Sequence, residues 1–352
     1  MICARATRWV CAAAAVLFSA AWNVSFGAPT SLVWTVATSY PSDTVSGQSV
    51  RSFAADVTAA TGRRLVAHPR YRVSDVAGKL LADVQSGRVQ IASIFAGSLG
   101  KLDPIFELQT LPFRVHSIED ARRLTCLARE RYEIAFSRLG LRLLFISPWP
   151  PSGLWSRWHV FAPHTLSGMR VRSYNQASTQ ILTAFGMDAI EMSAGEAVRG
   201  VKQGTLDAVL SSGDGEVGRA FAADIRNFTA LDYAYPISFV VVRADTFDAL
   251  PRVLQASIID TSKAAERAHW DALPARIMSN AAAMRQLGVT VNTDLDPTLR
   301  KDLLSAGYSS GESWLARVPP EDAAVLVAYR HPPTPANLPC IPSAPTSSVA
   351  VE

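Results

Sequence analysis

Residues 168–212 read GMRVRSYNQASTQILTAFGMDAIEMSAGEAVRGVKQGTLDAVLSS, and short β-rich runs alternate there with helical segments. GMRVRSY, DAIEM and TLDAVLSS predict strands. A helix is expected around Thr179–Phe185, ended by Gly186, and a second from Ser193 to Gln203, where Ser193 and Glu196 can form a capping box. Alternating units of this length predict an α/β fold with mainly parallel sheets covered by helices.

The same alternation extends to both sides of this stretch. Strands are predicted at Leu32–Thr38, Val89–Phe95, Leu141–Ser147, in WHVFA (residues 158–162) and at Pro236–Val242. The proline cluster PWPPSG, residues 148–153, is typical of a crossover between two domains. From Leu250 to Gly288 the composition predicts one long helix, kinked at Pro274.

The first 27 residues have the pattern of a secretory signal. Arg5 and Arg8 precede an apolar run from Trp9 to Trp22, and small residues precede a cut expected after Gly27. An uncleaved membrane anchor is the alternative. Loss of Arg5 and Arg8 would lower the formal net charge from +4 to +2, and no basic run interleaved with aromatics follows, so no nucleic-acid partner is expected.

The other end of the chain is rich in proline. Residues 331–352 contain PPTPANLPCIPSAPTSS, which predicts a disordered tail. Once the signal is removed, Cys126 and Cys340 remain and can form at most one bridge; two unpaired thiols are the expectation. No CxxC or HxxxH spacing occurs, so neither a metal site nor a cofactor is predicted.

One motif suggests an enzyme. Gly307-Tyr308-Ser309-Ser310-Gly311 matches the GxSxG elbow of α/β hydrolases, which needs a strand before the serine and a helix after it. Here a helical stretch precedes the motif, so a turn ending a helix is expected instead. An exported α/β hydrolase therefore remains the alternative to a binding protein.

Two arginines in GMRVR suggest a binding site. Arg170 and Arg172 are two residues apart in a predicted strand, so they face the same side. Both could be solvated surface residues. Alternatively, one guanidinium reaches into a cleft and binds a carboxylate through two parallel hydrogen bonds.

Five pieces of the chain resemble, in order, the substrate-binding proteins of TRAP transporters, the DctP family. They are FAADVTAATGRRL, VQSGRVQIASIFAGSLG, PIFELQTLPF, residues 166–212 from LSGMRVRSY to AVLSS, and VVRADTFDALPRVLQASI. The resemblance implies a two-lobe periplasmic-binding-protein fold with largely parallel mixed sheets, crossover strands and a long connecting helix. Lobe I would comprise residues 28–148 and 237–273, and lobe II residues 149–236 and 274–330.

The resemblance also implies a function. The protein would be a periplasmic solute receptor that binds an organic acid between its lobes and delivers it to TRAP membrane permease subunits, without catalysis; a ligand-binding partner of a sensor is a further alternative. Arg172 maps onto the family arginine that pairs with the ligand carboxylate, and Arg170 would lie outside the pocket. At the end of GTLDAVLSS, Ser211 takes the position of a ligand-binding polar residue, followed by Ser212 and Asp214.

Other candidates follow from position along the predicted strands. Tyr40, Phe95, Trp155 and Tyr235 lie at or just beyond strand ends, where open α/β sheets bind ligands, although each could equally be a core residue. Ser152 occupies the region where sialic-acid-type members have a second arginine. With Trp149 and Trp155 nearby, this favours a monocarboxylate with an apolar or aromatic body.

Overall fold

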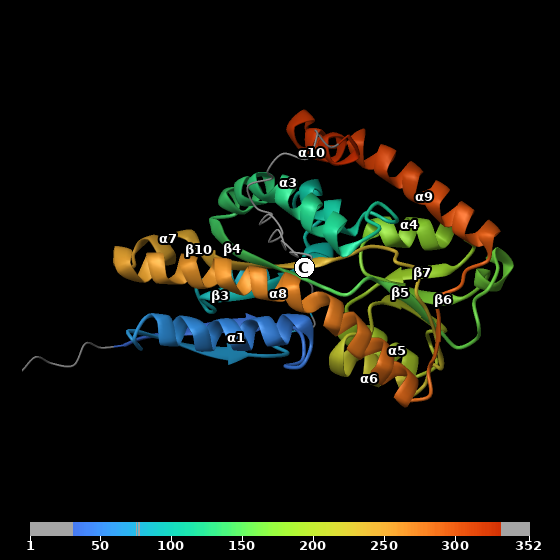
Figure 1. Ribbon diagram of the computed structural model, residues 1–352, viewed down its shortest axis with the longest axis horizontal. Coiled ribbons are helices and arrows are strands. Elements are labelled where there is room, and N and C mark those ends of the chain that lie inside the picture. Colours follow the sequence, from blue (N-terminus) through green and yellow to red (C-terminus); the bar gives the residue numbers. More distant parts are fainter. Residues whose placement is uncertain (1–30, 75, 77, 332–352) are drawn as a thin grey trace, which may run out of the picture. The chain divides into compact units, whose positions relative to one another are not determined.

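The computed structural model describes residues 31–74, 76 and 78–331, which form two β-sheets with helices packed against them (Figure 1). The predicted signal (1–27) and almost all of the predicted tail (332–352) lie outside the described residues. Within the described part, no helix is both long enough and apolar enough to span a bilayer.

The first sheet has the strand order β2-β1-β3-β10-β4, and only β10 runs antiparallel to its neighbours. Its strands are β1 (Leu32–Thr38), β2 (Leu65–Arg70), β3 (Ile91–Phe95), β4 (Leu141–Pro148) and β10 (Ile237–Arg243). Successive side chains point to opposite faces, so Val36 enters one core and Ala37 the other. Helix α1 (Val45–Ala60) covers the Val36 face; α2 (Lys79–Gln85) and α3 (Ile118–Arg138) cover the Ala37 face.

The second sheet has the order β11-β9-β5-β8-β6-β7 and is also mixed. Its strands are β5 (Gly153–Ser156), β6 (Arg170–Ser173), β7 (Asp188–Glu191), β8 (Ala208–Ser211), β9 (Asn227–Thr229) and β11 (Thr290–Asn292). Helices α4 (Gln176–Ala184) and α9 (Pro297–Leu315) cover the face that carries Leu154 and Leu210. Helices α5 (Ala194–Lys202) and α6 (Gly215–Ala222) cover the face that carries Trp155 and Val209.

Two extended segments connect the sheets. The backbone N–H of Trp149 donates to the carbonyl of Pro236 at 2.8 Å, and that of Ser152 donates to the carbonyl of Ala234 at 2.9 Å. Residues 149–152 and 233–236 therefore run side by side between β4 and β5 and between β9 and β10. The proline cluster predicted this crossover, because prolines interrupt the regular pairing of a central strand.

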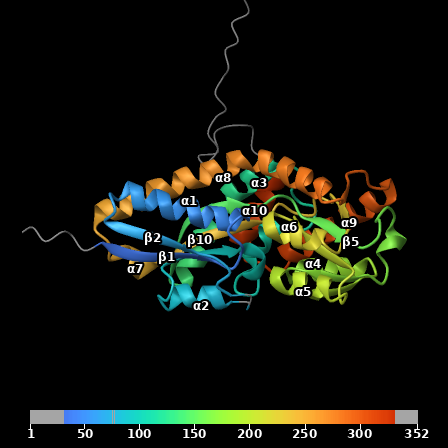
Figure 2. The ribbon, with the colours of Figure 1, turned by 90° about the horizontal axis from the view of Figure 1, so that it is seen from below.

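Helix α8 (Arg252–Gln286) is the predicted long helix and contains Pro274. It packs on α1 and β4 in its first part and on α6 and β11 in its last part, so it reaches both sheets. Figures 1 and 2 show α8 lying along α1 and changing direction along its length. Pro274 accounts for the bend, because it lacks the N–H that would bond the preceding turn.

The helix caps follow the sequence closely. Ser117 accepts a hydrogen bond from the backbone N–H of Asp120 at the start of α3. At the start of α5, Ser193 and Glu196 form the predicted capping box. The remaining helices are α7 (Ala244–Asp248), α10 (Pro320–Arg330) and three 3₁₀ segments at Ala96–Ser98, Pro104–Thr110 and Pro163–Leu166.

The lobe boundaries stay a prediction. All strands of the first sheet fall within residues 28–148 and 237–273, and all strands of the second fall within 149–236 and 274–330. The last two helices do not follow this division between the predicted lobes. Helix α10 packs on α3, and Trp314 at the end of α9 belongs to the core on the Ala37 face of the first sheet.

Three sequence-based expectations are corrected. WHVFA is not a strand. Instead β5 (Gly153–Ser156), which directly follows the crossover, pairs with β8 and β9. The GxSxG motif does not end a helix but lies inside α9, where Gly307 approaches the carbonyl of Pro112 too closely for a side chain and Gly311 lies against the guanidinium of Arg114. Cys126 is disulfide-bonded rather than free.

Candidate functional site

Arg172 is held at the carboxyl edge of three parallel strands. Strand β6 begins after Gly168, whose φ of +74° suits glycine, and it lies between β7 and β8 with Arg172 opposite Ile190 and Val209. The Arg172 Nε donates to the carbonyl of Met192 at 2.9 Å, and Nη1 donates to the carbonyl of Leu210 at 2.7 Å. Both acceptors lie at strand ends, so they fix the guanidinium at the edge where open sheets bind ligands.

The Arg172 side chain is buried, with 6% of the residue exposed. Burial lowers the pKa of the guanidinium from its usual value, and nearby Tyr40 and Tyr174, followed by the carboxylates of Glu196 and Glu191, raise it in part. Among the described residues, no carboxylate forms an ion pair with Arg172; its hydrogen bonds go to the two carbonyls. A buried cation without a directly bonded carboxylate is unfavourable, so an arriving anion would be stabilised by it.

Four aromatic rings from both sheets gather near this guanidinium. We call them the aromatic cluster: Tyr40 after β1, Phe95 at the end of β3, Trp149 after β4 and Tyr174 after β6. The Tyr40 ring lies 4.7 Å from that of Trp149, and the Phe95 ring lies 5.5 Å from that of Tyr174. The Arg172 Cζ lies 5.5 Å from the centre of the Tyr174 ring. The cluster therefore joins apolar surface to one buried cation.

The cluster also has polar edges. Trp149 Nε1 donates to Ser238 Oγ at 2.8 Å, which fixes the indole plane. Burial raises the pKa of Tyr40, whereas the charge of Arg172 lowers it in part. Burial likewise raises the pKa of Tyr174, whereas the charge of Arg172 lowers it in part; among the described residues the Tyr174 hydroxyl has no hydrogen-bond partner. Both phenols are therefore neutral hydrogen-bonding groups at neutral pH.

Two of the predicted aromatic residues lie elsewhere. Trp155 is fully buried in the core between the second sheet and α6, where its ring lies 5.7 Å from that of Phe221 and 5.3 Å from that of Phe228. Tyr235 is buried in the core on the Ala37 face of the first sheet. Both occupy core positions in this conformation.

The predicted polar residues follow β8. Ser211 and Ser212 are half-buried, and Ser211 Oγ accepts a hydrogen bond from the backbone N–H of Gly213 at 3.1 Å. Asp214 is buried, and its carboxylate is occupied by protein donors: Arg276 Nε at 2.6 Å, Asn280 Nδ2 at 2.7 Å and the backbone N–H of Val45 at 2.7 Å. Its partners come from α8 and from the start of α1, so Asp214 links both sheets to the long helix.

Arg170 has a different role from Arg172. Its side chain is 44% exposed and pairs with Asp207, at 2.7 Å from Nη2 to Oδ1 and 2.8 Å from Nε to Oδ2. Hydrogen bonding to Arg170 lowers the pKa of Asp207. This pair joins the start of β6 to the residue that precedes β8.

Sequence reasoning left Tyr174 out and did not place Trp149 in the candidate set. Tyr174 follows directly on β6, two residues after Arg172, and this closeness was the signal available. Trp149 stands inside the crossover, where any large side chain lies near both sheets. The GxSxG serine is no nucleophile candidate, because an elbow needs a strand-turn-helix and Ser309 Oγ instead contacts the carbonyl of Ser305 within α9.

Comparison with known proteins identifies the family. A family model described as bacterial extracellular solute-binding protein, family 7 (DctP), matches residues 36–302. This chain belongs to that family. The predicted family resemblance and the two-lobe fold of its TRAP relatives are thereby confirmed.

Individual relatives are distant. A solute-binding protein of Chromohalobacter salexigens is 27% identical over 177 residues, 48% of this chain and 50% of the relative, so the chain spans half of that relative's length. The 2,3-diketo-L-gulonate-binding periplasmic protein YiaO of Escherichia coli is 23% identical over 232 residues, 64% of this chain and 70% of the relative. Among solved structures, the Bordetella pertussis extracytoplasmic solute receptor DctP7, which binds pyroglutamic acid, superposes with a TM-score of 0.81 at 25% identity, covering 85% of this chain and 100% of that one.

Proposed function

We propose that this DctP-family protein binds the carboxylate of a small organic acid at Arg172 and delivers the acid to TRAP permease subunits from the periplasm. The observation that carries the proposal is the buried Arg172 guanidinium, which has two carbonyl acceptors and no carboxylate partner within the described ranges. An acid would supply the missing negative charge through charge-assisted hydrogen bonds.

The aromatic cluster limits the body of the acid. Tyr40, Phe95, Trp149 and Tyr174 offer ring faces and edges, and Arg172 is the buried cation among them. Ser152, buried beside Tyr174, supplies a hydroxyl where a second cation would suit a diacid. This set fits a compact monocarboxylate with a flat body, the class to which the pyroglutamic acid of the Bordetella receptor belongs.

The set of residues proposed to contact the ligand differs from the set predicted from sequence. Arg172, Tyr40 and Phe95 remain, with Tyr174 and Trp149 added, and Ser211 and Ser212 remain as polar contacts at the end of β8. We leave out Trp155 and Tyr235, which occupy cores, and Asp214, whose oxygens are bonded to Arg276, Asn280 and Val45.

A thermal-shift assay with pyroglutamate tests the ligand class. At a free acid concentration 100 times its Kd, binding stabilises the folded state by about 2.7 kcal/mol, which raises Tm by several degrees. The matched control is the carboxamide of pyroglutamate, which has the same ring and no charge, and it should leave Tm unchanged. Equal stabilisation by acid and carboxamide would overturn the assignment of Arg172 as a carboxylate site.

Export is the second part of the proposal. We infer that residues 1–27 direct secretion and are removed after Gly27, because two arginines precede an apolar run and a small-residue cut site. N-terminal sequencing of protein purified from the periplasm is expected to begin near Ala28. A chain that keeps Met1 and stays with the membrane would indicate an uncleaved anchor instead.

A further inference from the structure

Tyr174 brings an unused hydrogen-bonding group to the Arg172 site. It follows directly on β6, and the centre of its ring lies 5.5 Å from the Arg172 Cζ. The residue is 7% exposed, and its hydroxyl makes no hydrogen bond to any described residue. Ser152 lies near that hydroxyl but forms no hydrogen bond with it. A buried phenol in this state is unfavourable, because it has lost its bonds to water and gained none in the protein.

The hydroxyl of Tyr174 lies where the two sheets meet. The Tyr174 ring lies 5.5 Å from that of Phe95, at the end of β3 in the first sheet, and the Phe95 ring lies 6.5 Å from that of Tyr40. The charge of Arg172 lowers the pKa of both Tyr40 and Tyr174 in part, which places both hydroxyls near the guanidinium. The unused hydroxyl is therefore close to the position proposed for the ligand carboxylate.

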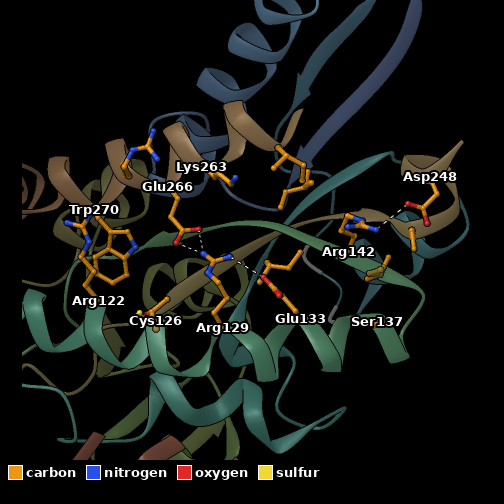
Figure 3. A pocket seen from close by; sticks show the side chains of 17 residues that line it. Arg122, Cys126, Arg129, Glu133, Ser137, Arg142, Asp248, Lys263, Glu266 and Trp270 are labelled. Carbon is orange, nitrogen blue, oxygen red and sulfur yellow. Dashed lines mark hydrogen bonds and ion pairs between the residues drawn. The ribbon is translucent and has the colours of Figure 1, made fainter. Parts of the chain in front are cut away.

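Arg172 differs from a partly buried arginine elsewhere in the fold. In the cavity between α3, β4 and α8, Arg129 pairs with the carboxylates of Glu266 and Glu133 (Figure 3). Arg172 instead donates from Nε and Nη1 to backbone carbonyls, and a guanidinium has further N–H donors beyond these two. Arg172 and Tyr174 thus combine donors that the described part of the protein does not use.

The carboxylates whose charge acts on Arg172 already have partners of their own. They are Glu191 and Glu196. Glu191 pairs with Lys101 at 3.0 Å, and Glu196 accepts a hydrogen bond from the backbone N–H of Ser193 at 2.8 Å. An ammonium group on the ligand would therefore be repelled by Arg172 without a carboxylate to compensate it. A ligand without an amine is expected.

The positive charge of Arg172 also decides which group suits Tyr174. A phenol hydroxyl can donate or accept a hydrogen bond. Beside a guanidinium, however, an electron-rich oxygen is stabilised and a second donor is not. The atom of the ligand that meets the Tyr174 hydroxyl is therefore expected to be an acceptor, such as a carbonyl oxygen.

We propose that Tyr174 donates its hydroxyl hydrogen to a neutral acceptor of the ligand while Arg172 binds the carboxylate. The protein then selects oxo acids, which are compact acids with a ketone or amide carbonyl near the carboxylate and no amine. This inference rests on the proposed function, since it requires that the carboxylate binds at Arg172. Tyr174 is the residue that tells an oxo acid from an acid with a plain hydrocarbon ring.

Two acids that differ by one carbonyl test this inference. The first is 3-oxocyclopentanecarboxylate, which keeps the ring size and the carbonyl position of pyroglutamate, and the second is cyclopentanecarboxylate. Isothermal titration is expected to show that the wild type binds the oxo acid about tenfold more tightly, because the other acid leaves the Tyr174 hydroxyl unpaired. In Tyr174→Phe this preference should disappear.

Tyr132 is the matched control. Its hydroxyl is also buried and makes no hydrogen bond to a described residue, but it lies in the core on the Ala37 face of the first sheet, against Phe106 and Phe239. Tyr132→Phe should keep the preference for the oxo acid. Without ligand, both variants should have a Tm equal to or above that of the wild type, because each loses a buried polar group that has no partner.

The possible results separate this inference from the proposed function. If the wild type bound neither of the two acids nor pyroglutamate, the carboxylate site at Arg172 would fail and the role of Tyr174 with it. If the wild type bound both acids equally, or Tyr174→Phe kept the preference for the oxo acid, the role of Tyr174 alone would be overturned. A Tm of ligand-free Tyr174→Phe several degrees below that of the wild type would also overturn it, since the hydroxyl would then be bonded within the protein.

Discussion

Arg172→Ala is expected to abolish binding of the organic acid while the protein stays folded. The guanidinium is buried, and within the described residues its hydrogen bonds go to the carbonyls of Met192 and Leu210 rather than to a carboxylate. Removing one member of a buried charge pair costs about 2–5 kcal/mol, so Kd should rise by a factor of about 30 or more. Isothermal titration with pyroglutamate, or with whichever acid raises Tm, measures this change.

Arg172→Lys separates charge from geometry. Lysine keeps the positive charge but lacks the planar fork that binds two oxygens at once, so binding should be weakened less than in the alanine variant and remain well below wild type. Arg170→Ala is the matched control on the same strand, since its partner is Asp207 and its side chain is half exposed. It should leave Kd unchanged. Equal losses in Arg170→Ala and Arg172→Ala would contradict a specific site at Arg172.

Local patterns predicted the fold well because they depend on near neighbours in the chain. The strand at Leu32–Thr38 and the capping box at Ser193 both appear as expected. The crossover followed from the proline cluster for the same reason. The prediction of a strand at WHVFA was wrong. The strand in this region is Gly153–Ser156, which pairs with β8 and β9, and these partners are too distant in sequence for a local pattern to reveal them.

The site was only partly predictable from the sequence. Position at a strand end brought Tyr40 and Phe95 near Arg172, but the same rule also selected Trp155 and Tyr235, which the sheets bury in cores. Strand position does not tell which face of a sheet a helix will cover. Asp214 shows the same limit: its partners Arg276 and Val45 are 62 and 169 residues away, so nothing in the turn Ser-Ser-Gly-Asp-Gly indicates an ion pair.

Asp214→Asn is expected to lower the free energy of unfolding substantially. The Asp214 carboxylate accepts hydrogen bonds from Arg276 and Asn280 of α8 and from the N–H of Val45 at the start of α1. Its side chain is almost wholly buried, and that of Arg276 is only 20% exposed. Breaking a buried ion pair by removing one partner costs about 3–5 kcal/mol, because the other charge is left without compensation. Chemical denaturation of the two purified proteins measures the difference.

The position of Asp214 adds a second expected effect. Asp214 follows β8 of the second sheet, Val45 begins the helix that covers the first sheet, and Arg276 also donates to the carbonyl of Asp43. The variant should therefore hold the two sheets together less tightly, and small-angle X-ray scattering should give a larger radius of gyration than for wild type. Glu216→Gln is the matched control, because the ion pair of Glu216 with Arg72 joins the same two regions but is about half exposed on both sides. An exposed pair contributes about 0–1 kcal/mol. If Asp214→Asn were no less stable than Glu216→Gln, the buried carboxylate could not be what fastens the two sheets to the long helix.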